Sequence, residues 1–350
     1  MITDRSVFRD DWLPDVQHRE AEMTVLTDAL TPVLEGVRAE DVLLHGPQGV
    51  GKTVLTRAAL DRLNRQQPTP SAHVHCLGTS TAGIVRSILQ ELPGSDPART
   101  TPQEELIATL QERVSEPTVV VLDEGDDLPE ADVLDVLRRV PDISWIAICH
   151  DEIDWLSRVD ESTRHGLTDR SLQLDKFTTS ELTDILEARQ RVGLEGGAIS
   201  RGQLRMLADG AAGVARRGIF ALRAAAELAT ERGHTTIEDV DVEDSFDRAR
   251  RQLREQALES LPLHHHILYE IIRRKGEVQT AAINDRYDAI STVAYDGYDQ
   301  MPISKRDRRT KLQKLVDYDL VDRRDEDRKR VYWACDRSIS SPLDLQVPVP

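Results

Sequence analysis

The segment Gly46-Pro-Gln-Gly-Val-Gly-Lys-Thr53 follows directly on the apolar run Val42–Leu44. It matches the pattern G-x-x-x-x-G-K-[ST], placed between a predicted strand and a predicted helix as its chemistry requires. Glycines let backbone N–H groups close around phosphate oxygens, and the start of the helix adds the positive end of its dipole. The sequence therefore predicts a nucleoside triphosphate site. Its predicted residues are Gly46, Gly49, Val50, Gly51, Lys52, Thr53 and Val54.

Within this site the two polar side chains have separate predicted roles. Lys52 can reach the β- and γ-phosphates, and the Thr53 hydroxyl can hold Mg²⁺.

A second run, Thr118–Glu124, is apolar up to Leu122 and ends in two acids, Asp123 and Glu124, about 70 residues after the glycine-rich loop. A wholly apolar strand is typical of the centre of a parallel sheet. Asp123 is predicted to share the Mg²⁺ shell with Thr53, and Glu124 to polarise the attacking water. The alternative is that the two acids only open a solvated turn, since Asp126 and Asp127 follow. Together with the upstream loop, the pair predicts hydrolysis as well as binding.

Composition limits the class of protein. The 350 residues can form two or three domains, and the three cysteines are scattered, which predicts a reducing compartment and no disulfide framework. The chain has no apolar stretch of membrane-spanning length and no signal-peptide pattern near Met1, so we expect a soluble cytoplasmic protein.

The charge of −17 is unevenly distributed, since residues 259–350 hold 16 acids and 16 bases. Only 7 of the 45 basic residues are lysines. This acidic, arginine-rich composition indicates adaptation to high salt, although a GC-rich genome also favours arginine. The less acidic carboxyl-terminal part points to a polyanionic partner there.

Strand and helix signals alternate up to about residue 176, which predicts an α/β domain with a doubly wound parallel sheet. Expected strands cover residues 42–45, 73–77, 119–123 and 145–149. From residue 178 the pattern is helical throughout and predicts an all-α lid. The expected domains are 1–176, 177–257 and 258–337, followed by a tail, 338–350.

The third predicted domain has the order of a winged helix: helices at 265–275 and 280–293, a basic helix from Ser304, and a hairpin across 320–334. The third helix of that fold enters a DNA major groove. The alternative is that the charges only solvate the helix. The hairpin favours DNA binding, by Lys305, Arg306, Arg308, Arg309 and Lys311 on the helix and Arg328, Lys329 and Arg330 on the hairpin.

Together these parts resemble the archaeal origin-recognition and cell-division-control family of replication initiators, which are AAA+ ATPases with a winged helix. The likeness covers roughly residues 7–337 and rests on the glycine-rich loop, the strand ending at Asp123 and four further segments. These segments are Pro14–Glu20, His73–Cys76, Leu174–Leu186 with Arg189, and Gly213–Arg216. The resemblance implies that Phe177 and Arg189 lie against the nucleotide and that Arg216 senses its γ-phosphate.

Three departures from the family pattern predict weak hydrolysis. His150 stands where the family has an asparagine that orients the attacking water, and it either replaces that residue or has no role. The segment Val159–Leu167 lacks the usual Asp-Pro-Arg, which leaves Arg164 as the nearest candidate arginine finger. Such a finger contributes roughly 10³–10⁵ in rate. Finally, Gly125-Asp126 follows Glu124 where the family has Ile-Asp.

The resemblance implies an ATP- and Mg²⁺-dependent initiator that binds origin duplex DNA and acts as a slow switch for helicase loading, as a divergent haloarchaeal paralogue. Its implied partners are double-stranded DNA, the replicative helicase and paralogous initiators. A second hypothesis is a non-replicative DNA-binding regulator in which ATP is only structural. A third is a partner protein for helicase or clamp loading.

Overall fold

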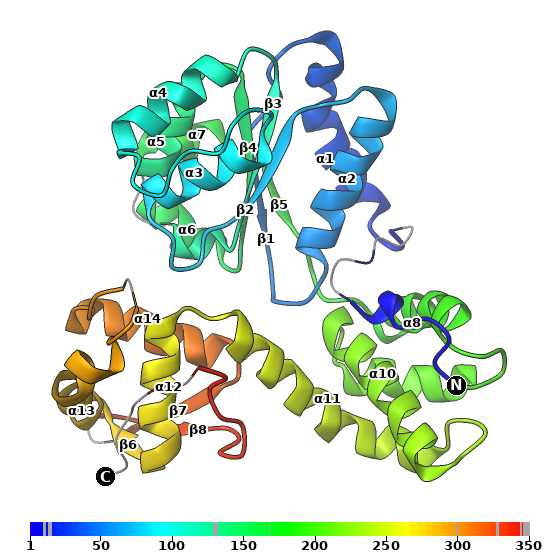
Figure 1. The fold of residues 1–350 in the computed structure, drawn as a ribbon. Helices are drawn as coiled ribbons and strands as arrows, with labels where there is room; N and C mark the ends of the chain where they lie inside the picture. Colours follow the sequence, from blue (N-terminus) through cyan, green and yellow to red (C-terminus); the bar gives the residue numbers. More distant parts are fainter. Residues whose placement is uncertain are drawn as a thin grey trace. The chain divides into compact units, whose positions relative to one another are not determined.

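The protein is described by a computed structural model over residues 1–9, 12, 16–128, 132–167, 169–298, 300–326, 329–343 and 345. The chain divides into two compact units, residues 1–243 and 244–350 (Figure 1). This division does not decide the domain boundaries expected at residues 176, 257 and 337, which stay predictions.

The first unit contains a five-stranded sheet in the order β2-β3-β4-β1-β5, with every neighbouring pair parallel. All four residues of β1 are buried, as are all of β3 and β4, because helices cover both faces. The predicted doubly wound parallel sheet is therefore confirmed. The strands are β1 (Val42–His45), β2 (Ser71–His75), β3 (Thr118–Asp123), β4 (Ile143–Cys149) and β5 (Ser171–Gln173).

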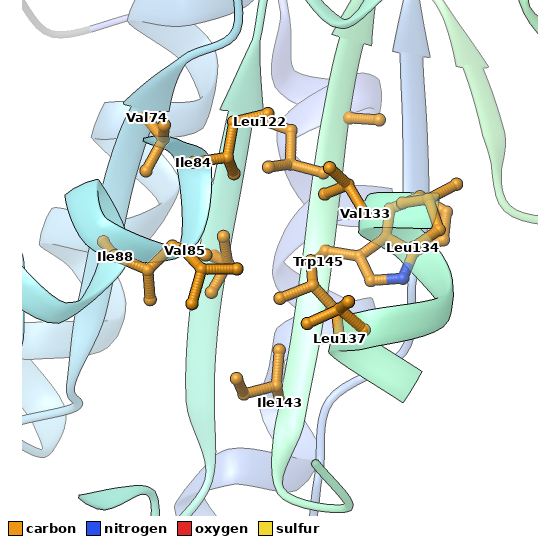
Figure 2. Close-up of a cluster of buried hydrophobic side chains, with 14 of the residues drawn as sticks. Val74, Ile84, Val85, Ile88, Leu122, Val133, Leu134, Leu137, Ile143 and Trp145 are labelled. Atoms are coloured by element: carbon orange, nitrogen blue, oxygen red, sulfur yellow. The ribbon is translucent and has the colours of Figure 1, made fainter. Parts of the chain in front are cut away.

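Alternate residues of β3 pack in two separate hydrophobic clusters, one on each face of the sheet. Val120 and Leu122 pack in the cluster that includes buried side chains of α3, α4 and α5, part of which is drawn in Figure 2. Val119 and Val121 pack in the opposite cluster, with side chains of α1 and α2. Period-two alternation on a buried strand thus fixes both layers. The helices are α1 (Glu20–Leu30), α2 (Lys52–Gln66), α3 (Thr81–Glu91), α4 (Gln103–Arg113) and α5 (Asp132–Arg138).

One strand and two α-helices among the described elements of this unit were not expected. They are the short strand β5 and the helices α6 (Glu152–Arg158) and α7 (Glu161–Gly166). β5 has only three residues, two of them polar, so it has too little apolar pattern to be recognised. β2 also begins two residues earlier than predicted and ends at His75, because the chain turns where Thr79 N donates to Cys76 O at 3.2 Å.

The helical lid follows as α8 (Thr179–Gly193), α9 (Arg201–Gly210) and α10 (Ala215–Arg232). Capping boxes start the first two of these helices, Thr178 with Glu181 and Ser200 with Gln203. A short 3₁₀ turn, η1 (Ser6–Phe8), packs on α8 so closely that a side chain at Gly193 would overlap Val7. The first residues of the chain are thereby part of the lid.

The second unit has the order of a winged helix. Helix α11 (Asp239–Ser260) spans the point where the two units divide, and α12 (Leu263–Lys275), α13 (Thr280–Ala294) and α14 (Lys305–Asp317) follow. β7 (Val321–Glu326) and β8 (Lys329–Ala334) form the expected hairpin. A two-residue strand that was not expected, β6 (Val278–Gln279), adds to β8, so the described sheet is three-stranded.

Among the described residues, no helix combines the length and apolarity that crossing a membrane requires.

Candidate nucleotide site and nucleic-acid interface

The glycine-rich loop lies between β1 and the first turn of α2, at the carboxyl edge of the sheet. Gly46, Gly49 and Gly51 all have positive φ, at 139°, 77° and 98°. A Cβ on Gly46 would lie 2.2 Å from the Leu174 carbonyl oxygen, so that position excludes any side chain. Positive φ and close backbone approach are the two reasons that require glycine here.

The remaining loop residues begin helix α2. The Lys52 ammonium is buried and donates to the carbonyls of Gly46 at 2.6 Å and Pro47 at 2.9 Å. Val50 is fully buried and Val54 half-buried, which anchors the loop in the core beneath it. The lysine and the first backbone N–H groups of α2 thus lie at the same helix end, an arrangement suited to a phosphate group.

Asp123 receives two polar side chains at the end of β3. Its Oδ2 accepts from Thr53 Oγ1 at 3.0 Å and lies 3.0 Å from His73 Nε2, while Oδ1 accepts from the Glu124 N–H. Burial raises the pKa of Asp123, but the hydrogen bonds from His73 and Thr53 and the nearby histidine charge outweigh it, so the pKa lies below its ordinary value. The ionised carboxylate is a suitable cation ligand.

Glu124 occupies a left-handed backbone conformation, with φ 56°. This backbone conformation is unfavourable for a residue with a long side chain. Such strain is often found at functional sites, where it fixes the direction of a side chain. Its half-buried carboxylate follows directly on Asp123.

His150, at the end of β4, is bound to Asp126. Its backbone N–H donates to both Asp126 carboxylate oxygens at 3.0 Å, and its Nδ1 lies 2.6 Å from Oδ2. Nε2 makes no hydrogen bond to any other described residue. The imidazole is thus fixed in orientation and retains one nitrogen that can bond to a water molecule.

The lid contacts the loop through its backbone. Arg216 N, at the start of α10, donates to Gly49 O at 3.1 Å, and a Cβ on Gly49 would lie 2.9 Å from Val214 Cγ1. Phe177 N donates to Gly213 O at 3.0 Å, and Gly213 has φ 77°. Backbone hydrogen bonds therefore link Gly49 of the loop to Arg216 at the start of α10, and Phe177 to Gly213 just before that helix.

Arg189 and Arg164 lie in different surroundings. Arg189 is buried, stacks 4.6 Å from the Trp12 ring and donates to the Val7 carbonyl. Arg164 is exposed on α7 and reaches the Leu156 carbonyl at 3.5 Å. Their predicted roles as nucleotide contact and arginine finger stay predictions.

The candidate DNA interface is the basic face of α14, defined by the exposed Lys305, Arg306 and Arg309 with the half-buried Lys311. Ser304 caps the helix by accepting from the Asp307 N–H at 3.2 Å. On the hairpin, Lys329 and Arg330 are exposed, and Arg330 pairs with Asp325 at 3.3 Å. Arg328 lies outside the described residues.

The prediction that Arg308 belongs to this exposed DNA-binding face is wrong, because its side chain is buried. The Arg308 side chain is 7% exposed, lies 3.9 Å from the centre of the Tyr287 ring, and pairs with Asp288. It also donates to the Ile303 carbonyl at 3.1 Å. Helical periodicity turns this position toward α13, so Arg308 joins α13 to α14 and is not available to a nucleic acid.

Four side chains near the nucleotide site were not predicted. Asp126 holds His150, and Arg19 stacks 4.1 Å from the Phe177 ring centre. His73 and His75 lie beside Asp123. The alternation His73-Val-His75 on a strand was the available signal for the last two, since residues i and i+2 share a face.

The fold and the loop define the class of protein. An AAA+ ATPase has a parallel sheet in this strand order, a phosphate-binding loop after β1 and a helical lid. Residues 15–171 match the family model of the AAA ATPase domain, and residues 183–247 match that of the Cdc6 AAA+ ATPase-type lid domain.

Full-length relatives identify the family. The chain is 32% identical over 349 residues to ORC1-type DNA replication protein 9 of Halobacterium salinarum, covering 97% of this chain and 96% of the relative. ORC1-type DNA replication protein 1 of the same organism is 32% identical over 300 residues, covering 83% and 96%. The chain belongs to the family of archaeal ORC1-type DNA replication proteins, as its motifs predicted.

The fold is similar to that of the Aeropyrum pernix ORC1 protein, solved in complex with DNA, with a TM-score of 0.76 at 24% identity over 97% of this chain and 95% of that one. The A. pernix ORC2 protein, solved with ADPNP and ADP, matches with a TM-score of 0.63 at 21% identity over 96% and 94%. The predicted fold class, with lid and winged helix, is confirmed.

We expect Arg308→Ala to destabilise the second unit by about 2 kcal/mol, because a buried guanidinium with a cation–π contact and a paired carboxylate is lost. Amide hydrogen exchange of the full chain, read over α12–α14, measures this loss. Arg309→Ala is the matched control, since its exposed side chain is on the same helix and should change stability by less than about 0.5 kcal/mol. Equal effects of the two substitutions would contradict the assigned burial.

Proposed function

We propose that this protein is an ATP-regulated DNA replication initiator that recognises origin duplex DNA and controls helicase loading as a slow switch. The observation that carries the proposal is the likeness over 97% of the chain to an ORC1-type DNA replication protein, together with retention of the loop and of Asp123. The proposed partners are double-stranded DNA, the replicative helicase and paralogous initiators. A protein with this role works in the cytoplasm, where an archaeal chromosome lies.

ATP is the proposed nucleotide, held by the loop and by Lys52. The ammonium bonds to two carbonyls of the loop itself, so it lies within reach of a phosphate that the loop encloses. The description of the A. pernix ORC2 protein as an ADPNP–ADP complex supports this assignment.

Mg²⁺ is the ion that an AAA+ site uses, and the residues present fit it. Thr53 Oγ1 and Asp123 Oδ2 lie 3.0 Å apart and are hard oxygen donors. When bound, the ion neutralises charge on the phosphates. Thr53 and Asp123 would hold it, and the two hydrogen bonds that Asp123 accepts from Thr53 and the Glu124 backbone fix the carboxylate plane.

The proposed switch is the contact between Gly49 and the start of α10. In this proposal a nucleotide in the loop changes the position of the backbone to which Arg216 N donates, and the Arg216 guanidinium senses the γ-phosphate. ATP then favours one lid position through its differential affinity for the two arrangements. Phe177, stacked with Arg19 and bonded to Gly213, connects this movement to the start of the lid.

Hydrolysis is assigned to Glu124, His150 and Arg164, and we expect it to be slow because His150 and the segment around Arg164 depart from the family pattern. Glu124 polarises the attacking water, and His150 orients it through the ring nitrogen that Asp126 does not engage. Arg164, exposed on α7, acts as the arginine finger of a neighbouring subunit.

DNA recognition is assigned to the basic face of α14, with Lys329 and Arg330 on the hairpin. Lys305, Arg306 and Arg309 are exposed in the first turns of α14, the third helix of the winged helix and the one that reads the major groove in that fold. The similar A. pernix ORC1 protein was solved in complex with DNA, which supports this role.

The proposed organisation keeps the expected domains, 1–176 for the nucleotide, 177–257 for the lid and 258–337 for DNA.

A DNA-binding regulator with structural ATP is the second candidate function. The observation that favours it is the engagement of His150 by Asp126 through both its backbone and its ring. In a regulator the histidine would stabilise the end of β4 and have no part in hydrolysis.

We expect Lys52→Ala to abolish ATP binding while the protein retains residual duplex binding, because the ammonium is the main side-chain cation of the loop. Fluorescent-nucleotide titration and duplex gel shifts measure the two properties separately. Lys275→Ala, an exposed lysine at the end of α12, is the control and should leave nucleotide affinity unchanged. Undiminished ATP affinity in Lys52→Ala would refute the assignment of the loop.

Arg309→Ala should weaken duplex binding about equally for all sequences and lower the slope of log K against log salt by about 0.9, as loss of one phosphate contact does. Fluorescence anisotropy over a range of salt concentrations measures both effects. Arg205→Ala, which removes an exposed arginine from α9, should change neither. If Arg309→Ala binds like the parent protein, the DNA surface lies elsewhere.

Hydrolysis separates the two candidate functions. A switch should turn over ATP slowly with or without duplex DNA, and Glu124→Gln should reduce turnover because the group that polarises water is lost. Phosphate release in single-turnover reactions measures the difference. If the parent protein and Glu124→Gln have the same residual rate of hydrolysis with and without duplex DNA, the result would favour the regulator.

A further inference from the structure

Two histidines on the edge strand β2 lie against the carboxylate that ends β3. In the parallel pairing of these strands, His75 is the partner of Asp123, and His73 is two residues earlier on the same face. The two imidazole rings are 5.3 Å apart between centroids, and His73 Nε2 lies 3.0 Å from Asp123 Oδ2. One donor atom from each of the three residues lies within 4.8 Å of the others.

The chemistry of these donors differs from that of a nucleotide's magnesium site. Magnesium prefers oxygen ligands, whereas imidazole nitrogen suits zinc, iron, copper and nickel. Two histidines with one carboxylate are a recurrent ligand set for catalytic zinc and for ferrous iron, with positions left open.

We propose that His73, His75 and Asp123 form a binding site for a divalent transition-metal ion, for which Zn²⁺ is the reference ligand. The inference concerns this chain's own donors and does not depend on the proposed role in replication.

The geometry needs little adjustment to close around an ion. Ligands at about 2.0–2.1 Å in a tetrahedral site are about 3.4 Å apart. The 3.0 Å between His73 and Asp123 is already close to that value. The exposed His75 is at the outer strand of the sheet, so its ring can rotate toward the ion without displacing core side chains.

Neighbouring groups define the limits of the site. Thr53 Oγ1 donates to the same Asp123 Oδ2, and it would hold that oxygen in place beside the ion. Cys76, the next residue along, is fully buried, its thiol donates to the Val74 carbonyl, and it is not among the three donors that lie within 4.8 Å of one another. The ligand set is therefore two nitrogens and one oxygen, and solvent completes the coordination.

A simpler account is that His73 only orients Asp123 through its hydrogen bond. That account gives His75 no ligand role: among the described residues its imidazole contacts the ring of His73 and makes no hydrogen bond to Asp123, although its charge helps to lower the pKa of that carboxyl. It predicts that replacing His75 changes no binding property, whereas the proposed site needs both nitrogens.

The test uses the full chain without an affinity tag, freed of metal by chelator and studied without nucleotide or DNA. Titration with Co²⁺, followed by its visible absorption, and with Zn²⁺, followed by calorimetry, should show one ion bound per chain. His73→Asn and His75→Asn should each weaken binding by about tenfold or more. His165→Asn, an exposed histidine on α7, is the matched control and should bind like the parent protein.

Circular dichroism of each variant establishes that it is folded. Absence of stoichiometric binding in the parent protein, or equal affinity in His75→Asn and the control, would overturn the proposal. Since neither nucleotide nor DNA is present, this outcome would leave the proposed replication function standing.

Discussion

The candidate nucleotide site depends on backbone segments that approach one another with no side chain between them. Gly46 lies against the Leu174 carbonyl, and Gly49 lies against Val214 and Arg216 of the lid. Because both glycines also have positive φ, a substituted residue would meet a steric and a conformational penalty together. This close approach allows the loop to contact both Leu174, the residue after β5, and the start of α10.

The same edge of the sheet concentrates polar groups on one carboxylate. Asp123 accepts from Thr53 and from the Glu124 backbone and lies beside His73, which keeps it ionised despite its burial. Parallel strands place their carboxyl ends at one edge, so His73, Asp123 and Thr53 meet there although Thr53 and Asp123 are 70 residues apart in sequence. This one carboxylate therefore contacts both a hydroxyl group and an imidazole ring beside the candidate nucleotide site.

Local patterns made much of this predictable. The loop, Asp123 and the start of α14 at Ser304 are encoded in short contiguous segments with a clear mechanism, and the sequence located each of them. Arg308 was misplaced because its burial depends on Tyr287 and Asp288, which α13 contributes. β5 escaped notice for another reason: its three residues have little apolar content, and pairing with β1 defines it as a strand. Long-range contacts, then, decided what local propensity left open.

The placement of Arg308 also changes how DNA recognition by an acidic protein should be understood. Removing it from the interface leaves a smaller exposed basic face, with acids such as Asp307 and Asp325 interspersed. At about 1 M salt the Debye length falls to about 3 Å, so charges act on phosphate only in direct contact and the surrounding acids repel little. At the proposed interface, phosphate contacts would therefore contribute less affinity in strong salt than in dilute salt, which would leave discrimination to base edges and DNA shape. A rigid α13–α14 pair, fixed by the buried Arg308, is suited to that task because base contacts depend on a well-defined helix position.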